Sequence, residues 1–139
     1  MKIIITSGYF DPIHVGHIEY LKLAKALGDK LIIILNSDYQ CKLKKGKPFM
    51  PQSERKIILE SLKFVDEVFY SIDKDKSVCN SIKAIAEKFH GEEIIFAKGG
   101  DRFSYEIPEA KICMEKEIKI IDNLGKKIQS SSKLIGLEE

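Results

Sequence analysis

The sequence lacks any long hydrophobic run. Its most apolar stretches, Ile3–Thr6 and Leu31–Leu35, are far too short to cross a membrane, and the one near the start is also too short for a signal peptide. Cysteine is scarce, and the three residues, Cys41, Cys79 and Cys113, are scattered without redox or zinc spacing. Such isolated thiols are typical of a reducing compartment, so we expect a cytoplasmic protein that does not bind membranes.

Excess charge is also missing. The 139 residues carry a net charge of only +2, so no overall basic field points to nucleic acid. There is no internal repeat, low-complexity segment or linker, and a hydrophobic content of 44% is ordinary for a globular protein. We therefore expect a single domain over residues 1–139.

Short apolar runs alternate with longer helical patterns. The runs are β-branched and mostly continuous, which predicts strands at Lys2–Ser7, Lys30–Asn36, Glu67–Ser71, Glu93–Lys98 and Ile118–Asp122. Apolar residues at helical spacing predict helices at Gly16–Leu27, Gln52–Phe64, Ser77–Phe89 and Ile107–Glu117, with a short closing helix at Ser130–Leu137. This alternation predicts a doubly wound, Rossmann-like α/β fold: a five-stranded parallel sheet with helices on both faces.

Two histidines follow the first predicted strand, at the start of the next helix. His14 and His17 are three residues apart, which places both imidazoles on one side of the first helical turn. Ring donors and free backbone amides at a helix start favour an anion such as phosphate. Zinc is disfavoured because no third ligand is nearby, and a dinucleotide site is disfavoured because Gly-x-Gly-x-x-Gly is absent. Surface or capping roles remain the plain alternative.

The stretch from Gly8 to His17 resembles the Gly-x-Phe-Asp-x-x-His-x-Gly-His signature of the cytidylyltransferase-like nucleotidylyltransferases. The resemblance runs through nearly the whole chain and implies that both histidines bind nucleotide phosphates during catalysis. It also implies nucleotide contacts from Gly8, Tyr9 and Phe10, and a supporting or cation-related role for Asp11. Mg²⁺ is expected to arrive with the nucleoside triphosphate (NTP).

A lysine-rich stretch follows the second predicted strand. It contains Lys42, Lys44, Lys45 and Lys47 with no acidic residue between them, and it is either a solvated loop or a flexible lid over a triphosphate. Family members carry lysines at a similar place, followed by an arginine in the next helix, which Arg55 matches. The resemblance therefore implies catalytic roles for Arg55 and for Lys45, with Lys47 also contacting the nucleotide.

Two later segments bear on the branch of the family. Lys98-Gly99-Gly100-Asp101 resembles the heptose 1-phosphate adenylyltransferases, with the glycines leaving space for a base or ribose and Asp101 accepting from a ribose hydroxyl. Ser130, Ser131 and Ser132 cap a helix or hold phosphate there. The Arg-Thr-Glu-Gly element of polyol-phosphate cytidylyltransferases is absent, since residues 123–127 read Asn-Leu-Gly-Lys-Lys.

The sequence thus predicts a nucleotidylyltransferase that moves a nucleoside monophosphate from an NTP, with ATP favoured, to a phosphorylated sugar such as heptose 1-phosphate. The alternatives are a CTP-dependent glycerol 3-phosphate or amino-alcohol phosphate cytidylyltransferase, an FMN or phosphopantetheine adenylyltransferase, and a nucleotide-binding regulatory module without turnover. Acceptor contacts are expected from Ile72–Cys79 and Phe103–Glu109. Relatives commonly dimerise, which implies a homodimer.

Overall fold

Five parallel strands form one sheet in the order β3-β2-β1-β4-β5 in the computed structural model, which describes residues 1–99 and 107–121. The strands are β1 (Lys2–Gly8), β2 (Lys30–Leu35), β3 (Glu67–Tyr70), β4 (Glu93–Ala97) and β5 (Lys119–Ile121). The helices are α1 (Val15–Lys25), α2 (Asp38–Lys45), α3 (Gln52–Glu60), α4 (Cys79–Lys88) and α5 (Ala110–Glu115). The predicted α/β class and all five strand positions are confirmed.

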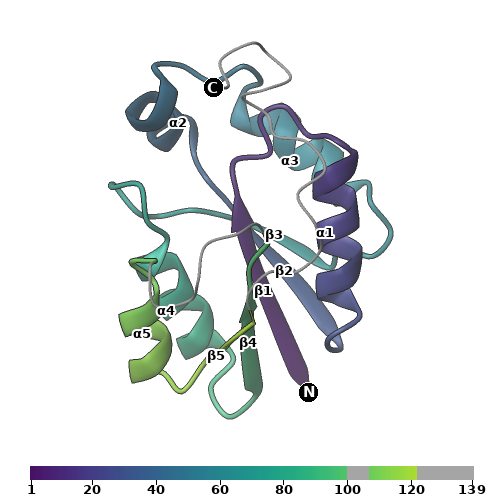
Figure 1. Ribbon diagram of the computed structural model, residues 1–139, viewed down its shortest axis with the longest axis vertical. Coiled ribbons are helices and arrows are strands. Elements are labelled where there is room, and N and C mark those ends of the chain that lie inside the picture. The colour runs from purple at the N-terminus through teal and green to yellow at the C-terminus, as the bar shows by residue number, and fades with distance from the viewer. Residues whose placement is uncertain (100–106, 122–139) are drawn as a thin grey trace.

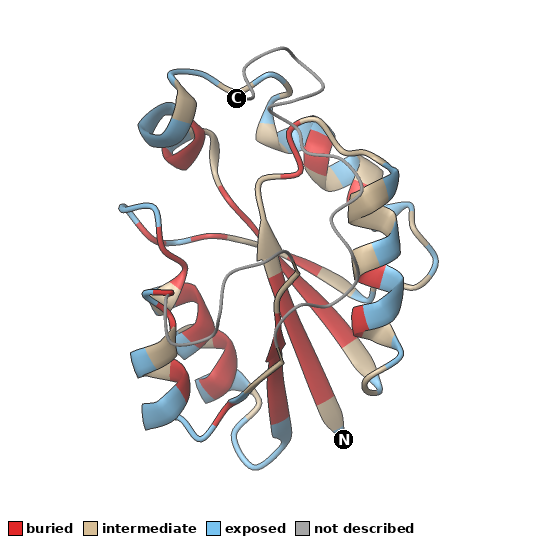
Figure 2. Cartoon of the chain, viewed as in Figure 1, coloured by how far each residue is buried: buried red, intermediate tan, exposed pale blue. Residues whose placement is uncertain are grey.

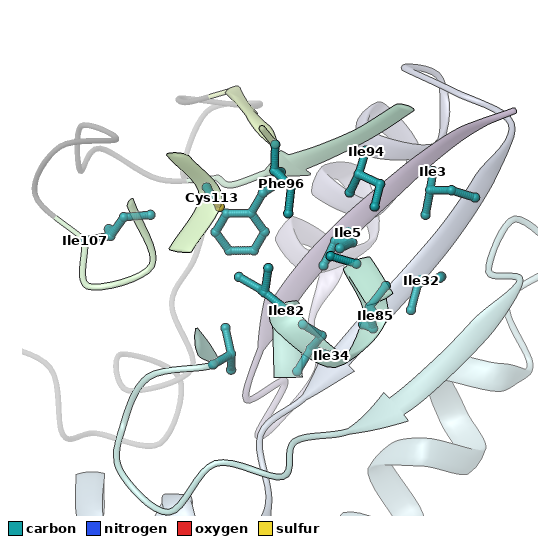
Figure 3. Close-up of a cluster of buried hydrophobic side chains, with 13 residues drawn as sticks. Ile3, Ile5, Ile32, Ile34, Ile82, Ile85, Ile94, Phe96, Ile107 and Cys113 are labelled. Carbon is teal, nitrogen blue, oxygen red and sulfur yellow. The ribbon is translucent and has the colours of Figure 1, made fainter. Parts of the chain in front are cut away.

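Helices cover both faces of the sheet. Alternate strand residues point to opposite faces: Ile3 and Ile5 pack with α4 and α5, whereas Ile4 packs with α1 and α3. Figure 1 shows the two helix pairs on opposite sides of the strands, and Figure 3 shows the first of these clusters, where Ile82 and Ile85 of α4 face the strand residues. In Figure 2 the central strands are largely buried, as their continuous apolar runs predict.

The lysine-rich stretch is a helix, which corrects the prediction of a flexible loop. Ser37 caps α2 by accepting from the Gln40 backbone N–H, and the Gln40 side chain accepts in return from the Ser37 backbone. Gly46 ends the helix with a φ of 91°. Ser37-x-x-Gln40 is a capping box, and this signal predicts the helix start from sequence. Lys47 alone of the four lysines lies beyond α2.

The other predicted helices within the described residues lie where expected but are shorter, most clearly α3, which ends at Glu60 rather than Phe64. The closing helix predicted at Ser130–Leu137 lies outside the described residues. The described part of the chain contains no helix long and apolar enough to cross a membrane. All three cysteines are unpaired.

The chain order reverses at β1, which lies between β2 and β4. Pairing with β2 continues to Gly8, but pairing with β4 stops at Ile5 opposite Phe96. The carboxyl ends of β1 and β4 therefore separate, and ligands of open α/β sheets bind in the crevice at such a point.

Candidate functional site

The two histidines of the signature lie together at the start of α1, as predicted. His14 is the N-cap residue, and its Nδ1 accepts from the Gly16 backbone N–H at 3.1 Å. His17 Nδ1 accepts from the His14 backbone N–H, also at 3.1 Å. The two rings stack with centroids 3.8 Å apart and an interplanar angle of 20°. The pair is thus a capping box built from two histidines.

These bonds fix the protonation of both rings. A ring nitrogen that accepts a hydrogen bond carries no proton, so each neutral imidazole carries its proton on Nε2. The pKa of His17 is lowered to about 3, mainly by burial and also by the positive charges of Lys44 and of His14 when it is protonated. Burial also lowers the pKa of His14. Both histidines are therefore neutral Nε2–H donors at neutral pH, and His14 Nε2 is buried without a partner among the described residues.

The capping box also corrects one expectation about the helix start. The Gly16 amide bonds to His14 Nδ1, and the His17 amide bonds to the His14 carbonyl. These two amides are therefore used within the protein, whereas the sequence predicts that they are free to bind an anion.

Phe10 holds His17 from the other side. Its ring meets the His17 ring edge-on, with centroids 4.9 Å apart, and is almost fully buried. Gly8 makes this possible, because a Cβ there would lie 2.9 Å from a carbon of the Phe10 ring. The resemblance implies that Gly8 and Phe10 contact the nucleotide, and in the structure the Phe10 ring packs edge-on against His17.

Asp11 ties the signature loop to the segment between α2 and α3. Its fully buried carboxylate accepts from the backbone N–H groups of Phe49 and Met50, at 2.7 and 2.6 Å. Lys45 Nζ lies 3.0 Å from the Asp11 carboxylate and donates to the Asp11 carbonyl at 2.7 Å. Of the two roles expected for Asp11, these contacts fit the supporting one.

Arg55 is buried and hydrogen-bonded on several sides. Its Nη1 donates to the carbonyls of Tyr9 and Asn36, each at 2.8 Å. Its Nε donates to the Met50 carbonyl at 2.9 Å, and Nη2 pairs with Asp38 Oδ1 at 2.8 Å. The guanidinium thus joins the exits of β1 and β2 to α2 and the start of α3. Most partners of Arg55 are distant in sequence and come together only when the chain folds. No local sequence pattern therefore predicts them.

Lys44 places a positive charge near the histidines. Its ammonium sits 4.3 Å from the centroid of the Tyr9 ring, and its charge contributes to the lowered pKa of His17. The side chain of Lys45 is only 12% exposed because of its contacts with Asp11. Lys47 is exposed beyond the end of α2.

The two stretches expected to bind the acceptor meet where they are described. Val78, within Ile72–Cys79, donates its backbone N–H to Glu109 Oε2 at 2.8 Å, and the Glu109 carboxylate is buried. Burial raises the pKa of Tyr9 to about 12, and the negative charge of Glu109 adds to this effect. Tyr9 is therefore within range of the charges of both Lys44 and Glu109.

Several predicted site residues lie after β4 or near the end of the chain. Gly99 is described directly after β4 and is partly exposed. Gly100, Asp101, Ser130, Ser131 and Ser132 lie outside the described residues. Within the described residues, no group of three or more His, Cys, Asp and Glu side chains is arranged to hold a metal ion.

Comparison with known proteins decides the family. The cytidylyltransferase-like family model matches residues 5–135. The chain belongs to the cytidylyltransferase-like family. This confirms the resemblance drawn from the Gly8–His17 signature and the predicted enzyme class, nucleotidylyl transfer.

Curated relatives include the bifunctional protein HldE of a Nitratiruptor species, which is 38% identical over 123 residues, covering 87% of this chain and 24% of that protein. HldE of Wolinella succinogenes is 36% identical over 140 residues, covering 94% of this chain and 27% of that protein. The chain thus spans about a quarter of the length of these relatives. The fold also matches the crystal structure of the lipopolysaccharide core biosynthesis protein from Thermoplasma volcanium, with a TM-score of 0.71, 23% identity and coverage of 88% of this chain and 96% of that one.

Proposed function

We propose that this chain transfers the nucleoside monophosphate of an NTP, with ATP favoured, to a phosphorylated sugar such as heptose 1-phosphate. The observation that carries the proposal is the histidine pair, in which both Nδ1 atoms accept hydrogen bonds and the Nε2–H of His14 has no partner among the described residues. A buried donor without a partner is costly. The phosphate oxygens of a bound nucleotide supply the missing acceptor for His14 Nε2.

The proposed reaction is an in-line displacement at the α-phosphorus. An oxygen of the acceptor's phosphate forms a bond to this phosphorus, while the bond to the oxygen bridging to the β-phosphate breaks and pyrophosphate leaves. The acceptor phosphate is already ionised at neutral pH, so no general base is needed. The task of the protein is therefore to position two polyanions and to stabilise the charge that gathers on the phosphate oxygens.

The two Nε2–H groups of His14 and His17 stabilise this charge as neutral donors, and Lys44 adds a cation at the same side. Arg55 and Asp11 contribute by holding the loops that carry these groups. The described residues do not fit a resident metal ion, because Asp11 is already bonded to two amides and Lys45. Mg²⁺ therefore enters as part of the substrate, bound to the NTP phosphates.

The choice of ATP and a sugar phosphate rests on the Lys98-Gly99-Gly100-Asp101 element and is supported by the similarity to HldE proteins. A CTP-dependent reaction is the second candidate, favoured by the family description alone. We also propose that residues 1–139 form one catalytic domain that works in the cytoplasm as a homodimer.

A pyrophosphate-release assay tests the function. ATP, CTP, GTP and UTP are each combined with heptose 1-phosphate, glycerol 3-phosphate, an amino-alcohol phosphate and FMN, and the products are identified by mass spectrometry. We expect the highest rate with ATP and heptose 1-phosphate. Release with CTP alone would favour the second candidate, and nucleotide binding without release for any acceptor would favour a regulatory module.

A further inference from the structure

The hydroxyl of Tyr20 lies in the opening between β1 and β4. Tyr20 is in α1, three residues after His17, and its ring packs in the core between α1 and the sheet. Its Oη donates to the Ala97 carbonyl at 2.6 Å, and the Ser7 backbone lies close enough to the phenol to lower its pKa, against the larger opposite effect of burial. The side chain of Tyr20 is thus bonded to the last residue of β4 and lies beside Ser7 near the end of β1, where these two strands are no longer paired.

The register shows what the hydroxyl replaces. The β1–β4 ladder begins with the Glu93 N–H donating to the Met1 carbonyl, and its paired residues end at Ile5 and Phe96. Bonds in a parallel ladder are evenly spaced, so the next bond in this register would join the Ser7 N–H to the Ala97 carbonyl. The Tyr20 hydroxyl donates to the Ala97 carbonyl in its place and lies beside the Ser7 backbone.

Ser7 and Ala97 lead directly into the site. Ser7 precedes Gly8 and the signature loop, and Ala97 precedes Lys98 and Gly99. A direct bond between Ser7 and Ala97 would extend the β1–β4 pairing by one residue pair and narrow the crevice. The inserted hydroxyl keeps the strands apart at this point and gives the Ala97 carbonyl a donor.

We propose that Tyr20 is a positioning residue whose hydroxyl sets the separation of the β1 and β4 ends at the width that the nucleotide requires. The inference rests on the proposed function, because it takes the crevice to be the nucleotide site. Burial raises the pKa of the Tyr20 phenol, so it keeps its proton and donates to Ala97 throughout the physiological range.

The substitution Tyr20→Phe removes only the hydroxyl oxygen. We expect it to weaken Mg·ATP binding about tenfold, the effect of one lost hydrogen bond on positioning, and to raise the KM for ATP more than it changes kcat. The matched control is Ile82→Val, a fully buried residue on the opposite face of the sheet, which lowers the Tm without touching the crevice.

Binding is measured by calorimetry with Mg·ATP, the KM by pyrophosphate release, and the Ser7–Ala97 distance in a crystal structure of Y20F. An unchanged ATP affinity in Y20F, or an equal loss in I82V, would overturn the inference. If the wild-type chain binds ATP but releases no pyrophosphate with any acceptor, the proposed function fails while the affinities still test the role of Tyr20.

Discussion

His17 Nδ1 accepts from the backbone N–H of His14, and the two imidazoles stack 3.8 Å apart. In the proposed function each histidine therefore has two tasks: its Nδ1 caps the start of α1, and its Nε2–H donates to the nucleotide. Because the two tasks belong to different ring atoms, a substitution can remove one and keep the other.

His14→Asn separates the two tasks. The Asn carboxamide oxygen is a good N-cap, so we expect the free energy of unfolding to change by less than about 1 kcal/mol. The lost Nε2–H is expected to lower kcat by about 10²–10³-fold, by analogy with removal of one oxyanion donor. Steady-state pyrophosphate release and urea unfolding measure the two effects.

The control is His14→Ala, which loses both cap and donor and should cost about 1 kcal/mol more in stability than H14N. Native turnover in H14N would remove His14 from the catalytic machinery.

His17 should make the protein less stable in acid. Its pKa is about 3 in the folded chain, mainly through burial, against about 6.5 when unfolded. The unfolded state therefore binds the proton more readily, and stability is lost as the pH falls from about 6.5 towards 3. The lowered pKa of His14 acts in the same direction. Urea unfolding between pH 8 and pH 4 should show this decline.

His17→Gln keeps the capping box, since Gln at this position also accepts from the cap backbone, but removes the titrating ring. We expect a shallower pH dependence of the free energy of unfolding in H17Q. The exposed His90 supplies the control, because H90Q leaves the helix start intact. If the free energy of unfolding changes with pH equally in wild type and H17Q, His17 is not the group that destabilises the protein in acid.

The strands were predictable because each is a short β-branched run buried on both faces. Helix ends were less so. Leu62 and Phe64 continue the apolar spacing of α3, but they pack on the core from the turn that follows Glu60, so periodicity alone overestimates the helix. In α2 lysines are as numerous as apolar residues, and only the Ser37–Gln40 capping box indicates a helix.

The site was predictable in part, for a similar reason. The Gly8–His17 signature is local in sequence, so the histidine pair follows from it directly. The partners of a cationic side chain are not local: Arg55 bonds to carbonyls 46 and 19 residues away. A positive charge near a predicted phosphate site therefore does not reveal whether it faces the ligand or the protein.

Arg55→Lys should lower stability more than it changes nucleotide affinity. An ammonium cannot reproduce the four bonds of the buried guanidinium, and it leaves buried carbonyls without donors. We expect a loss of about 2–4 kcal/mol in the free energy of unfolding, measured by urea denaturation. Lys56→Gln, at the neighbouring and partly exposed position, should cost less than about 1 kcal/mol. Equal stability of R55K and wild type would contradict the structural role.

Lys44 and Lys45 are adjacent in sequence but lie in different surroundings, so the same substitution should have different effects. Lys44 is exposed at the Tyr9 ring beside the histidines, whereas Lys45 is held by Asp11. K44Q should raise the KM for the NTP about tenfold, because a charged hydrogen bond to phosphate is lost, and leave stability nearly unchanged.

K45Q should instead lower the free energy of unfolding by about 1–3 kcal/mol, because the buried Asp11 carboxylate loses its cationic partner. The exposed Lys42 on the same helix supplies the control for a general charge effect, since K42Q removes an equal charge away from these contacts. For all three variants, pyrophosphate release measures the KM for the NTP and urea unfolding measures the free energy of unfolding. A raised KM in K45Q at unaltered stability would mean that Lys45 leaves Asp11 to meet the triphosphate, and that Asp11 serves as its resting partner.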